Sequence, residues 1–308
     1  MRHFNYLKNY HHTCNTTDTT PKDATEPISN KYKNRWKMKL SVVICTIPDR
    51  LVYLSSLLTN LLKQSYLPDE LIIVTDKGQS NQILTAFPTI PSILRFKVVE
   101  SNGVGLSKAR NKGVEVSIGD IILFLDDDVI LPDVNILFRV KEAFEEDEKL
   151  GVYGVQVKPL FYNSVKLNDK FNWLYGCTDD RAVRPVGAFF AVRRECFNVV
   201  GLFDEKLGRY GKYLLSGEET EFFNRVQKYM KLKVKLDNNL MVEHIVSNRG
   251  WKYILRRAFM EGISKARFKS YDMRTERSYL FRYLKDPIGW MISTATILGY
   301  IYAKIRGV

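Results

Sequence analysis

Short runs rich in Ile, Val and Leu alternate with stretches in which apolar residues recur every three or four positions. The runs have the length and composition of buried strands. The recurrence is typical of helices that pack one face on a sheet. The strands predicted in the first half are residues 40–45, 71–74, 94–99 and 121–125. The predicted helices are residues 51–62, 107–116 and 136–144.

This alternation predicts an α/β fold, with a mostly parallel, Rossmann-like sheet and helices on both faces. In sheets of this kind the ligand lies at the carboxyl ends of the strands. Asp76 and the cluster Asp126–Asp128 each come just after a predicted strand. We therefore expect these side chains to meet in one crevice, despite their separation in sequence.

The whole pattern predicts one catalytic domain at residues 39–248, with a flanking region on each side. The second half is less regular, with strands expected at 152–157, 186–192 and 232–236 and a helix at 218–230. Residues 1–38 are rich in Asn, Thr and His and show no hydrophobic period. We expect them to form a disordered tail.

The C-terminal region 249–308 carries nine of the thirteen net positive charges. A basic amphipathic helix is expected first, and 17 uncharged residues follow at 287–303, with Trp290 and Tyr300 among them. This run is at the short limit for a membrane-spanning helix. A buried helix is one alternative. Basic flanks beside apolar and aromatic residues favour contact with an anionic membrane surface, which predicts a cytoplasmic protein at the inner face of the cell membrane.

Composition and charge narrow the class of protein. The 308 residues are 45% hydrophobic and 26% charged, which is ordinary for a globular protein and excludes a collagenous or polytopic membrane chain. A net charge of +13 favours an anionic partner, such as nucleic acid, a phosphorylated substrate or acidic lipid. The four cysteines lack the spacing of a zinc site, and their sparseness favours a reducing compartment.

Asp126, Asp127 and Asp128 form the sharpest candidate site. Adjacent carboxylates repel one another, and a buried apolar run precedes these three. A hard divalent cation prefers oxygen ligands and bridges carboxylates to a diphosphate. The cluster therefore predicts a metal site, with a solvated acidic turn as the alternative. A turn at Asp127 would be needed to aim Asp126 and Asp128 at one ion. His244 would complete the ligand set, with a structural role as the alternative.

Other polar groups are candidates for binding or catalysis. Asp76 would accept a hydrogen bond from a base or ribose, or would only initiate a turn. The segment 105–111, with Arg110, combines a helix start and cations, which suits a diphosphate. Glu218 and Glu219 lie where acidic residues stabilise a helix N-terminus. The functional alternative makes one of them a general base whose pKa is raised by burial.

Together these segments resemble the family 2 glycosyltransferases, inverting enzymes with the GT-A fold, over about residues 39–269. The motifs that carry the resemblance are residues 41–46 with Arg50, then 72–78, 105–113, 119–128, 185–194, 200–205 and 217–221. Residues 253–257 and 261–266 are similar to members that build lipid-linked or surface glycans, including archaeal dolichyl-phosphate-dependent ones. Glu219 stands where the family more often has Asp.

The resemblance implies a UDP-, GDP- or dTDP-sugar donor, a glycan or lipid-phosphate-linked acceptor, and one inverting displacement. It implies Mg²⁺ or Mn²⁺ on Asp126 and Asp128, with His244 as a further ligand. It implies that Glu219 takes the proton of the acceptor hydroxyl while Glu218 orients the acceptor. Donor contacts are implied for Thr46, Arg50, Asp76, Arg110, Asp127 and Gly187.

Two other classes of protein share some of these features. A metal-dependent nucleotidyltransferase also places carboxylates after a strand, but it would make a nucleotide sugar and release pyrophosphate. A basic adaptor for membranes or nucleic acid would need no catalytic site. Nucleic acid is disfavoured, because the positive charge is concentrated in the C-terminal region beside apolar residues and no binding motif is recognised.

Overall fold

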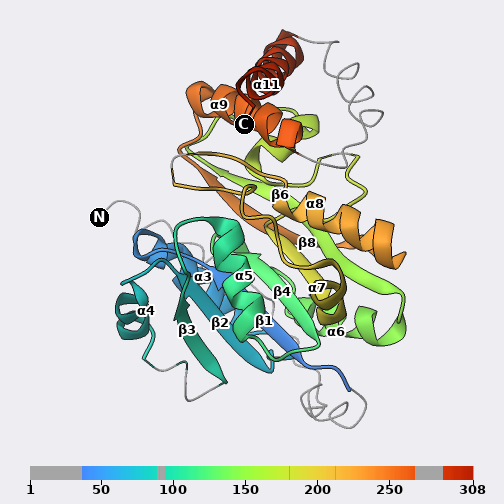
Figure 1. The fold of residues 1–308 in the computed structure, drawn as a ribbon. Coiled ribbons are helices and arrows are strands. Elements are labelled where there is room, and N and C mark those ends of the chain that lie inside the picture. Colours follow the sequence, from blue (N-terminus) through green and yellow to red (C-terminus); the bar gives the residue numbers. More distant parts are fainter. Residues whose placement is uncertain are drawn as a thin grey trace, which may run out of the picture.

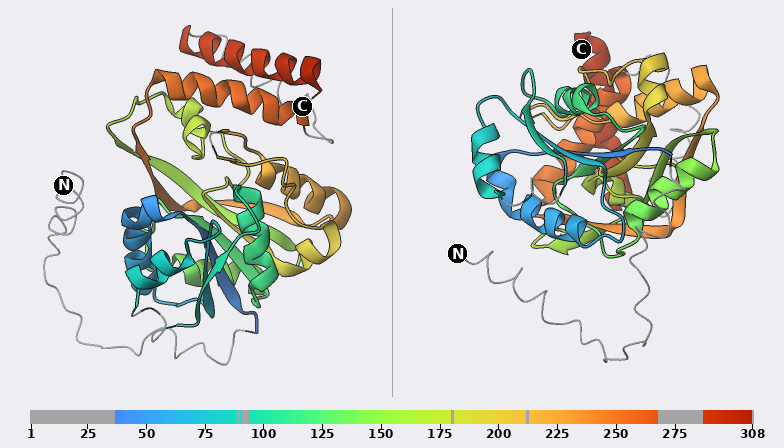
Figure 2. Two further views of the ribbon diagram at one scale, coloured as in Figure 1. Left: turned by 60° about the vertical axis from the view of Figure 1, so that its left-hand side comes forward. Right: turned by 90° about the horizontal axis from the view of Figure 1, so that it is seen from below.

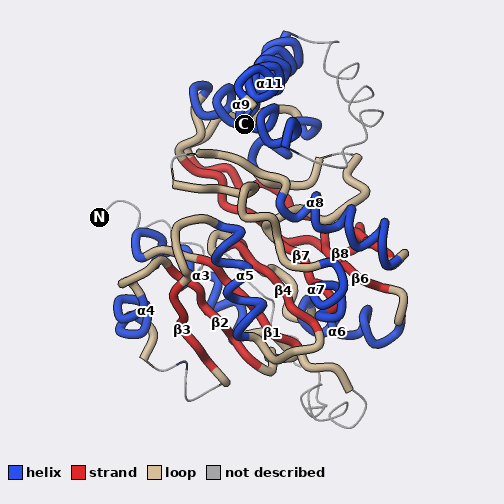
Figure 3. The backbone as a smooth tube through the Cα atoms, viewed as in Figure 1, coloured by secondary structure: helices blue, strands red, loops and turns tan. Residues whose placement is uncertain are grey.

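A mixed sheet of eight strands forms the centre of the molecule, in the order β3-β2-β1-β4-β7-β6-β8-β5 (Figures 1 and 3). The computed structural model describes residues 37–307 except 89, 91–93, 180, 212 and 268–286. The strands are β1 (Leu40–Cys45), β2 (Glu70–Thr75), β3 (Phe96–Glu100), β4 (Ile121–Asp126), β5 (Val129–Ile130), β6 (Leu150–Tyr162), β7 (Phe189–Arg193) and β8 (Lys233–Ser247). The tail expected at 1–38 lies outside the described residues except for its last two.

The parallel half of the sheet consists of β1 to β4, which are apolar because helices cover both faces. One face packs on α3 (Leu51–Leu62), α4 (Ser80–Ala86) and α6 (Ile136–Glu146). The other face packs on α5 (Leu106–Val116), α7 (Arg194–Val200) and α8 (Glu218–Arg225). The predicted α/β fold is confirmed.

The other half departs from the predicted elements. The strand expected at 232–236 is only the start of β8, which continues to Ser247 and pairs in parallel with β6. Its length was missed because only alternate residues near its end are buried, so polar residues interrupt the apolar pattern. β7 starts at Phe189, later than expected. The helix expected at 218–230 is α-helical to Arg225 and then becomes the π-helix Val226–Met230.

Two helices, α9 (Trp251–Arg267) and α11 (Pro287–Arg306), lie side by side at one end of the molecule (Figure 2). Glycines allow their close approach. A Cβ atom on Gly262 would lie 1.9 Å from the Thr296 carbonyl oxygen, and one on Gly299 would lie 1.9 Å from that of Phe259. Among the described residues, no helix combines the length and the apolar character needed to cross a bilayer.

Candidate active site

The carboxyl ends of β1, β2 and β4 lie at the same edge of the sheet. Cys45 pairs with Val74 on one side and with Asp126 on the other, so the residues that follow these strands emerge together. The Asp126 amide donates a hydrogen bond to the Ala188 carbonyl oxygen (3.0 Å), which brings the Gly187 segment to this edge. Asp76 follows β2 and is half-buried, and burial raises its pKa.

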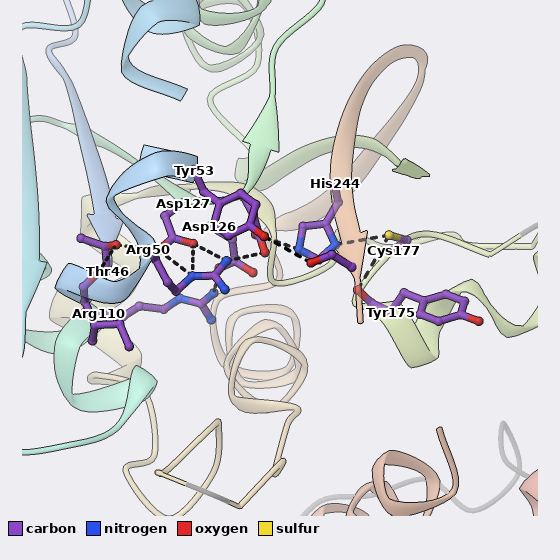
Figure 4. A network of polar contacts seen from close by, with 12 residues as sticks. Thr46, Arg50, Tyr53, Arg110, Asp126, Asp127, Tyr175, Cys177 and His244 are labelled. Atoms are coloured by element: carbon purple, nitrogen blue, oxygen red, sulfur yellow. Dashed lines mark hydrogen bonds and ion pairs between the residues drawn. The ribbon is translucent and has the colours of Figure 1, made fainter. Parts of the chain in front are cut away.

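Thr46 and Arg50 hold the acidic cluster from the β1 side (Figure 4). The Thr46 hydroxyl donates to Asp127 Oδ2 (2.6 Å), and Arg50 Nε donates to Asp127 Oδ1 (2.8 Å). Arg50 Nη2 contacts Asp128 Oδ2 at 2.5 Å. Burial raises the pKa of Asp127 to about 6, although Arg50 opposes this shift. Thr46 and Arg50, expected at the donor, thus both contact Asp127.

Asp126, Asp128 and His244 form a possible metal site. Their ligand atoms all lie within 4.8 Å of one another. Strand pairing brings His244 there: β8 pairs with β5, His244 lies opposite Val129, and the Ile245 amide donates to the Asp128 carbonyl oxygen (2.9 Å). His244 therefore lies within β8, in contact with the residues that follow β4.

Asp128 and His244 are buried, Asp126 is half-buried, and hydrogen bonds order this site. His244 Nε2 lies 2.9 Å from Asp128 Oδ1, and its Nδ1 lies 3.5 Å from Cys177 Sγ. Burial alone would lower the pKa of His244, but the charge and the hydrogen bond of the Asp128 carboxylate raise it above its ordinary value. Burial alone would raise the pKa of Asp128, but His244 and Arg50 together lower it below its ordinary value. Two carboxylates and an imidazole are a suitable ligand set for Mn²⁺ or Mg²⁺. The residues present therefore fit such an ion.

Arg110 connects the two acidic clusters. Its side chain is 2% exposed. Nη1 donates to Glu218 Oε1 (2.6 Å), and Nη2 donates to the Gly187 carbonyl oxygen (2.7 Å) and to Asp126 Oδ1 (3.2 Å). A buried guanidinium with these partners fixes their separation, because losing one partner would leave a buried charge unpaired. The expected contact of Arg110 with a diphosphate stays a prediction. Within the protein, its guanidinium connects Asp126, Gly187 and Glu218.

Glu219 lies in the first turn of α8, which begins after Gly217 (φ 86°). Burial and the charge of Glu218 raise the pKa of Glu219 to about 8. Glu218, Glu219, Asp126 and Gly187 line one cleft of about 680 Å³, a size typical of small-molecule sites. The two acidic clusters therefore meet at one cleft, and a carboxyl group with a raised pKa in a cleft is suited to proton transfer.

A group of cationic residues near this cleft was missed in the sequence. Arg209 lines the cleft, and Arg249 lies over the ring of Tyr253, 4.3 Å from its centroid. Burial would raise the pKa of Tyr253, but the positive charges of Arg209 and Arg249 lower it. The sequence shows only that this region is basic. Arg209 lies in a segment without helix or strand, so no repeating pattern of apolar residues in the sequence indicated that its side chain faces the site.

Comparisons with known proteins identify the family. The chain belongs to glycosyl transferase family 2, whose model matches residues 41–199. It is 26% identical over 246 residues to the glucosyl-dolichyl phosphate glucuronosyltransferase of Haloferax volcanii, covering 74% of this chain and 76% of that protein. It is 39% identical over 111 residues to the uncharacterized glycosyltransferase YwdF of Bacillus subtilis, covering 36% of this chain and 40% of that one.

Solved structures agree on the fold. The mannosyltransferase PcManGT from Pyrobaculum calidifontis, in complex with GDP-Man and Mn²⁺, matches with a TM-score of 0.59 at 18% identity, covering all of this chain and 83% of that one. GalNAc-T7 with UDP, GalNAc and Mn²⁺ matches with a TM-score of 0.53 at 15% identity. The match covers 88% of this chain and 58% of that one. The expected GT-A fold and glycosyltransferase family are thus confirmed.

Proposed function

We propose that this glycosyltransferase moves a sugar from a nucleoside diphosphate donor to a hydroxyl of a glycan or lipid-linked acceptor, with inversion at the anomeric carbon. One observation carries the proposal: Asp126 and Glu219, from distant parts of the chain, line the same cleft and are connected through Arg110 and Glu218. A metal site to stabilise the leaving diphosphate and a base to accept the proton of the acceptor suit this cleft to a single displacement.

Each group of side chains in the cleft has its own role in the proposed reaction. Glu219 accepts the proton of the acceptor hydroxyl as that oxygen attacks the anomeric carbon, and the bond to the nucleoside diphosphate breaks on the opposite face. Glu218, fixed by Arg110, orients the acceptor. Asp126, Asp128 and His244 would hold Mg²⁺ or Mn²⁺, which supplies charge stabilisation for the leaving diphosphate.

Donor binding is assigned to the strand ends around this site. Asp76 accepts a hydrogen bond from the base or ribose, and Thr46, Arg50 and Asp127 form the adjoining part of the donor site. The Gly187 segment lies beside the sugar. This assignment is supported by the shared edge of β1, β2 and β4, where ligands of parallel α/β sheets bind.

A donor panel tests the reaction class. UDP-, GDP- and dTDP-sugars are incubated with Mn²⁺ or Mg²⁺ and a lipid-phosphate-linked sugar acceptor, and release of nucleoside diphosphate and of pyrophosphate is measured separately. The proposal predicts nucleoside diphosphate. Pyrophosphate release from a nucleoside triphosphate and a sugar phosphate would instead identify a nucleotidyltransferase.

The metal requirement has its own test. Asp128→Asn removes one of the two carboxylates of the proposed ligand set, so we expect Mn²⁺ affinity to fall at least tenfold and turnover to be nearly abolished. Calorimetric Mn²⁺ titration and product release measure the two effects. Asp120→Asn is the control, because Asp120 precedes β4 at the opposite end of the strand. Full turnover of Asp128→Asn without metal would contradict a metal role.

We also propose that the protein works at an anionic membrane surface, on the cytoplasmic face. Large apolar side chains of α11 are exposed, namely Ile288, Trp290, Met291, Ile297, Leu298, Ile301, Tyr302 and Ile305. The described helix contains no acidic residue and ends with Lys304 and Arg306. An apolar face of this size with cationic ends suits the interface of an anionic bilayer.

A further inference from the structure

One wall of the cleft is formed by α9, which contributes Arg257, Glu261 and Lys265 on successive turns. Arg257 is only 7% exposed. Its Nη1 donates to the Leu214 carbonyl oxygen (2.7 Å) and lies 3.7 Å from Glu261 Oε2. The proposed mechanism uses none of these side chains.

This wall has more positive than negative charge. Burial alone would raise the pKa of Glu261, but the charges of Arg257 and Lys265 lower it. Glu261 also accepts a hydrogen bond from the Ser216 hydroxyl. Two cations and one carboxylate line this side of the cleft, which suits it to an anionic group.

Two buried N–H groups of the cleft-lining residues have no hydrogen-bond partner among the described residues. They are Nε of Arg257 and Nε1 of Trp173. Lys265 lies beside one of them, with its Nζ 5.9 Å from the Trp173 ring centroid, and all three residues line the same cleft. Buried donors without partners are costly and rare, so a ligand that accepts hydrogen bonds is expected beside them.

We propose that Arg257, Lys265 and Trp173 form a subsite for the phosphodiester of a lipid-linked sugar acceptor. The subsite rests on the proposed function and specifies the acceptor class. Its place is suitable: Glu261, in the middle of this wall, lines the same cleft as Glu219, so the subsite and the proposed base face one space. A sugar hydroxyl at Glu219 would then have its phosphodiester at α9, and the lipid chain would lead toward α11, which packs on α9 (Figure 2).

A pair of acceptors tests the subsite. Glucosyl phosphofarnesol carries the phosphodiester, and farnesyl glucoside is its neutral counterpart. The measured quantity is the ratio of kcat/KM for the two acceptors. In the unaltered protein we expect the phosphodiester to be preferred. In Arg257→Gln and in Lys265→Gln we expect that preference to fall at least tenfold.

Controls separate the possible outcomes. Lys252→Gln removes an exposed cation of α9 that does not line the cleft, and it should keep the preference. Circular dichroism checks that each variant folds. If Arg257→Gln does not fold, Lys265→Gln still tests the subsite. An unchanged preference in folded variants, or none in the unaltered protein, would overturn the subsite. If the unaltered protein transfers sugar to neither acceptor with any donor, the proposed function itself is wrong.

Discussion

Glu219 is the residue on which the proposed chemistry depends most directly. Glu219→Gln keeps the size of the side chain but removes proton acceptance, so we expect kcat to fall by about 10²–10⁴, with donor affinity within roughly tenfold. Product release and calorimetric donor binding measure the two effects. Glu221→Gln is the matched control, because Glu221 shares the first turn of α8 but pairs with Arg225. A Glu219→Gln variant that retains most of its rate would place the base elsewhere.

The raised pKa of Glu219 predicts opposite effects of pH on activity and stability. Burial, the charge of Glu218 and, more weakly, that of Glu261 raise the pKa of Glu219 to about 8, whereas Arg110 opposes this shift. Because the base must be ionised, kcat/KM should rise with pH and level off above about 8. The folded state binds this proton more tightly than the unfolded state, so its contribution to the unfolding free energy is lost as pH rises from 4.5 to about 8.

This linkage is measurable with a variant that does not ionise. Above pH 8, Glu219→Gln should melt at least about 2–4 °C higher than the unaltered protein, because ~1 kcal/mol, less than the linkage energy of one pKa unit, already gives this shift in a domain of this size. Near pH 4.5 the two melting temperatures should converge, because the native Glu219 is then protonated. Equal melting temperatures across this range would show that the native site does not raise the pKa.

At the scale of elements, the sequence predicts the parallel half of the sheet well and the rest poorly. Buried strands such as β4 are continuous apolar runs and therefore stand out. β5 has two residues, too few to show a period, yet its pairing with β8 brings His244 to Asp128. Individual candidate residues could be named from local motifs. Their contacts depend on pairings between segments far apart in the chain.

Aromatic packing fixes α8, and with it both glutamates. Phe222 is fully buried, stacks on Phe197 (ring centroids 4.6 Å apart) and contacts Phe203 (4.9 Å). Phe222→Ala should therefore lower the unfolding free energy by about 3–5 kcal/mol. Urea denaturation measures this change. Val199→Ala, at an exposed position of α7, should change it by less than about 0.5 kcal/mol. A loss below about 1 kcal/mol for Phe222→Ala would show that α8 does not depend on this packing.

At the scale of the whole molecule, α9 lies between the cleft and α11. One side of α9 lines the cleft with Arg257, Glu261 and Lys265, and Gly262 and Phe259 meet α11. Only α9 therefore separates α11, with its exposed apolar side chains, from the cleft. A bilayer in contact with α11 would hold the head group of a lipid-linked acceptor near Glu219 without a membrane-spanning helix.

This arrangement predicts how membrane binding can be removed while the cleft is kept. Leu298, Ile301 and Ile305 are exposed at helical spacing on α11. Replacing all three by Gln removes apolar area worth about 1 kcal/mol at each site, if each is half-buried in the bilayer. We expect binding to phosphatidylglycerol vesicles, measured by sedimentation, to fall at least tenfold, whereas donor binding remains.

The matched control replaces three exposed apolar residues far from α11, Val134, Val199 and Leu202, by Gln and should leave vesicle binding unchanged. Added salt should weaken binding of the unaltered protein, because Lys304 and Arg306 each contribute about 1 kcal/mol at an anionic surface. Unchanged sedimentation of the α11 variant would contradict a membrane-facing role for this helix. The acceptor would then have to reach Glu219 from solution, because no other part of the proposed mechanism places it at a membrane.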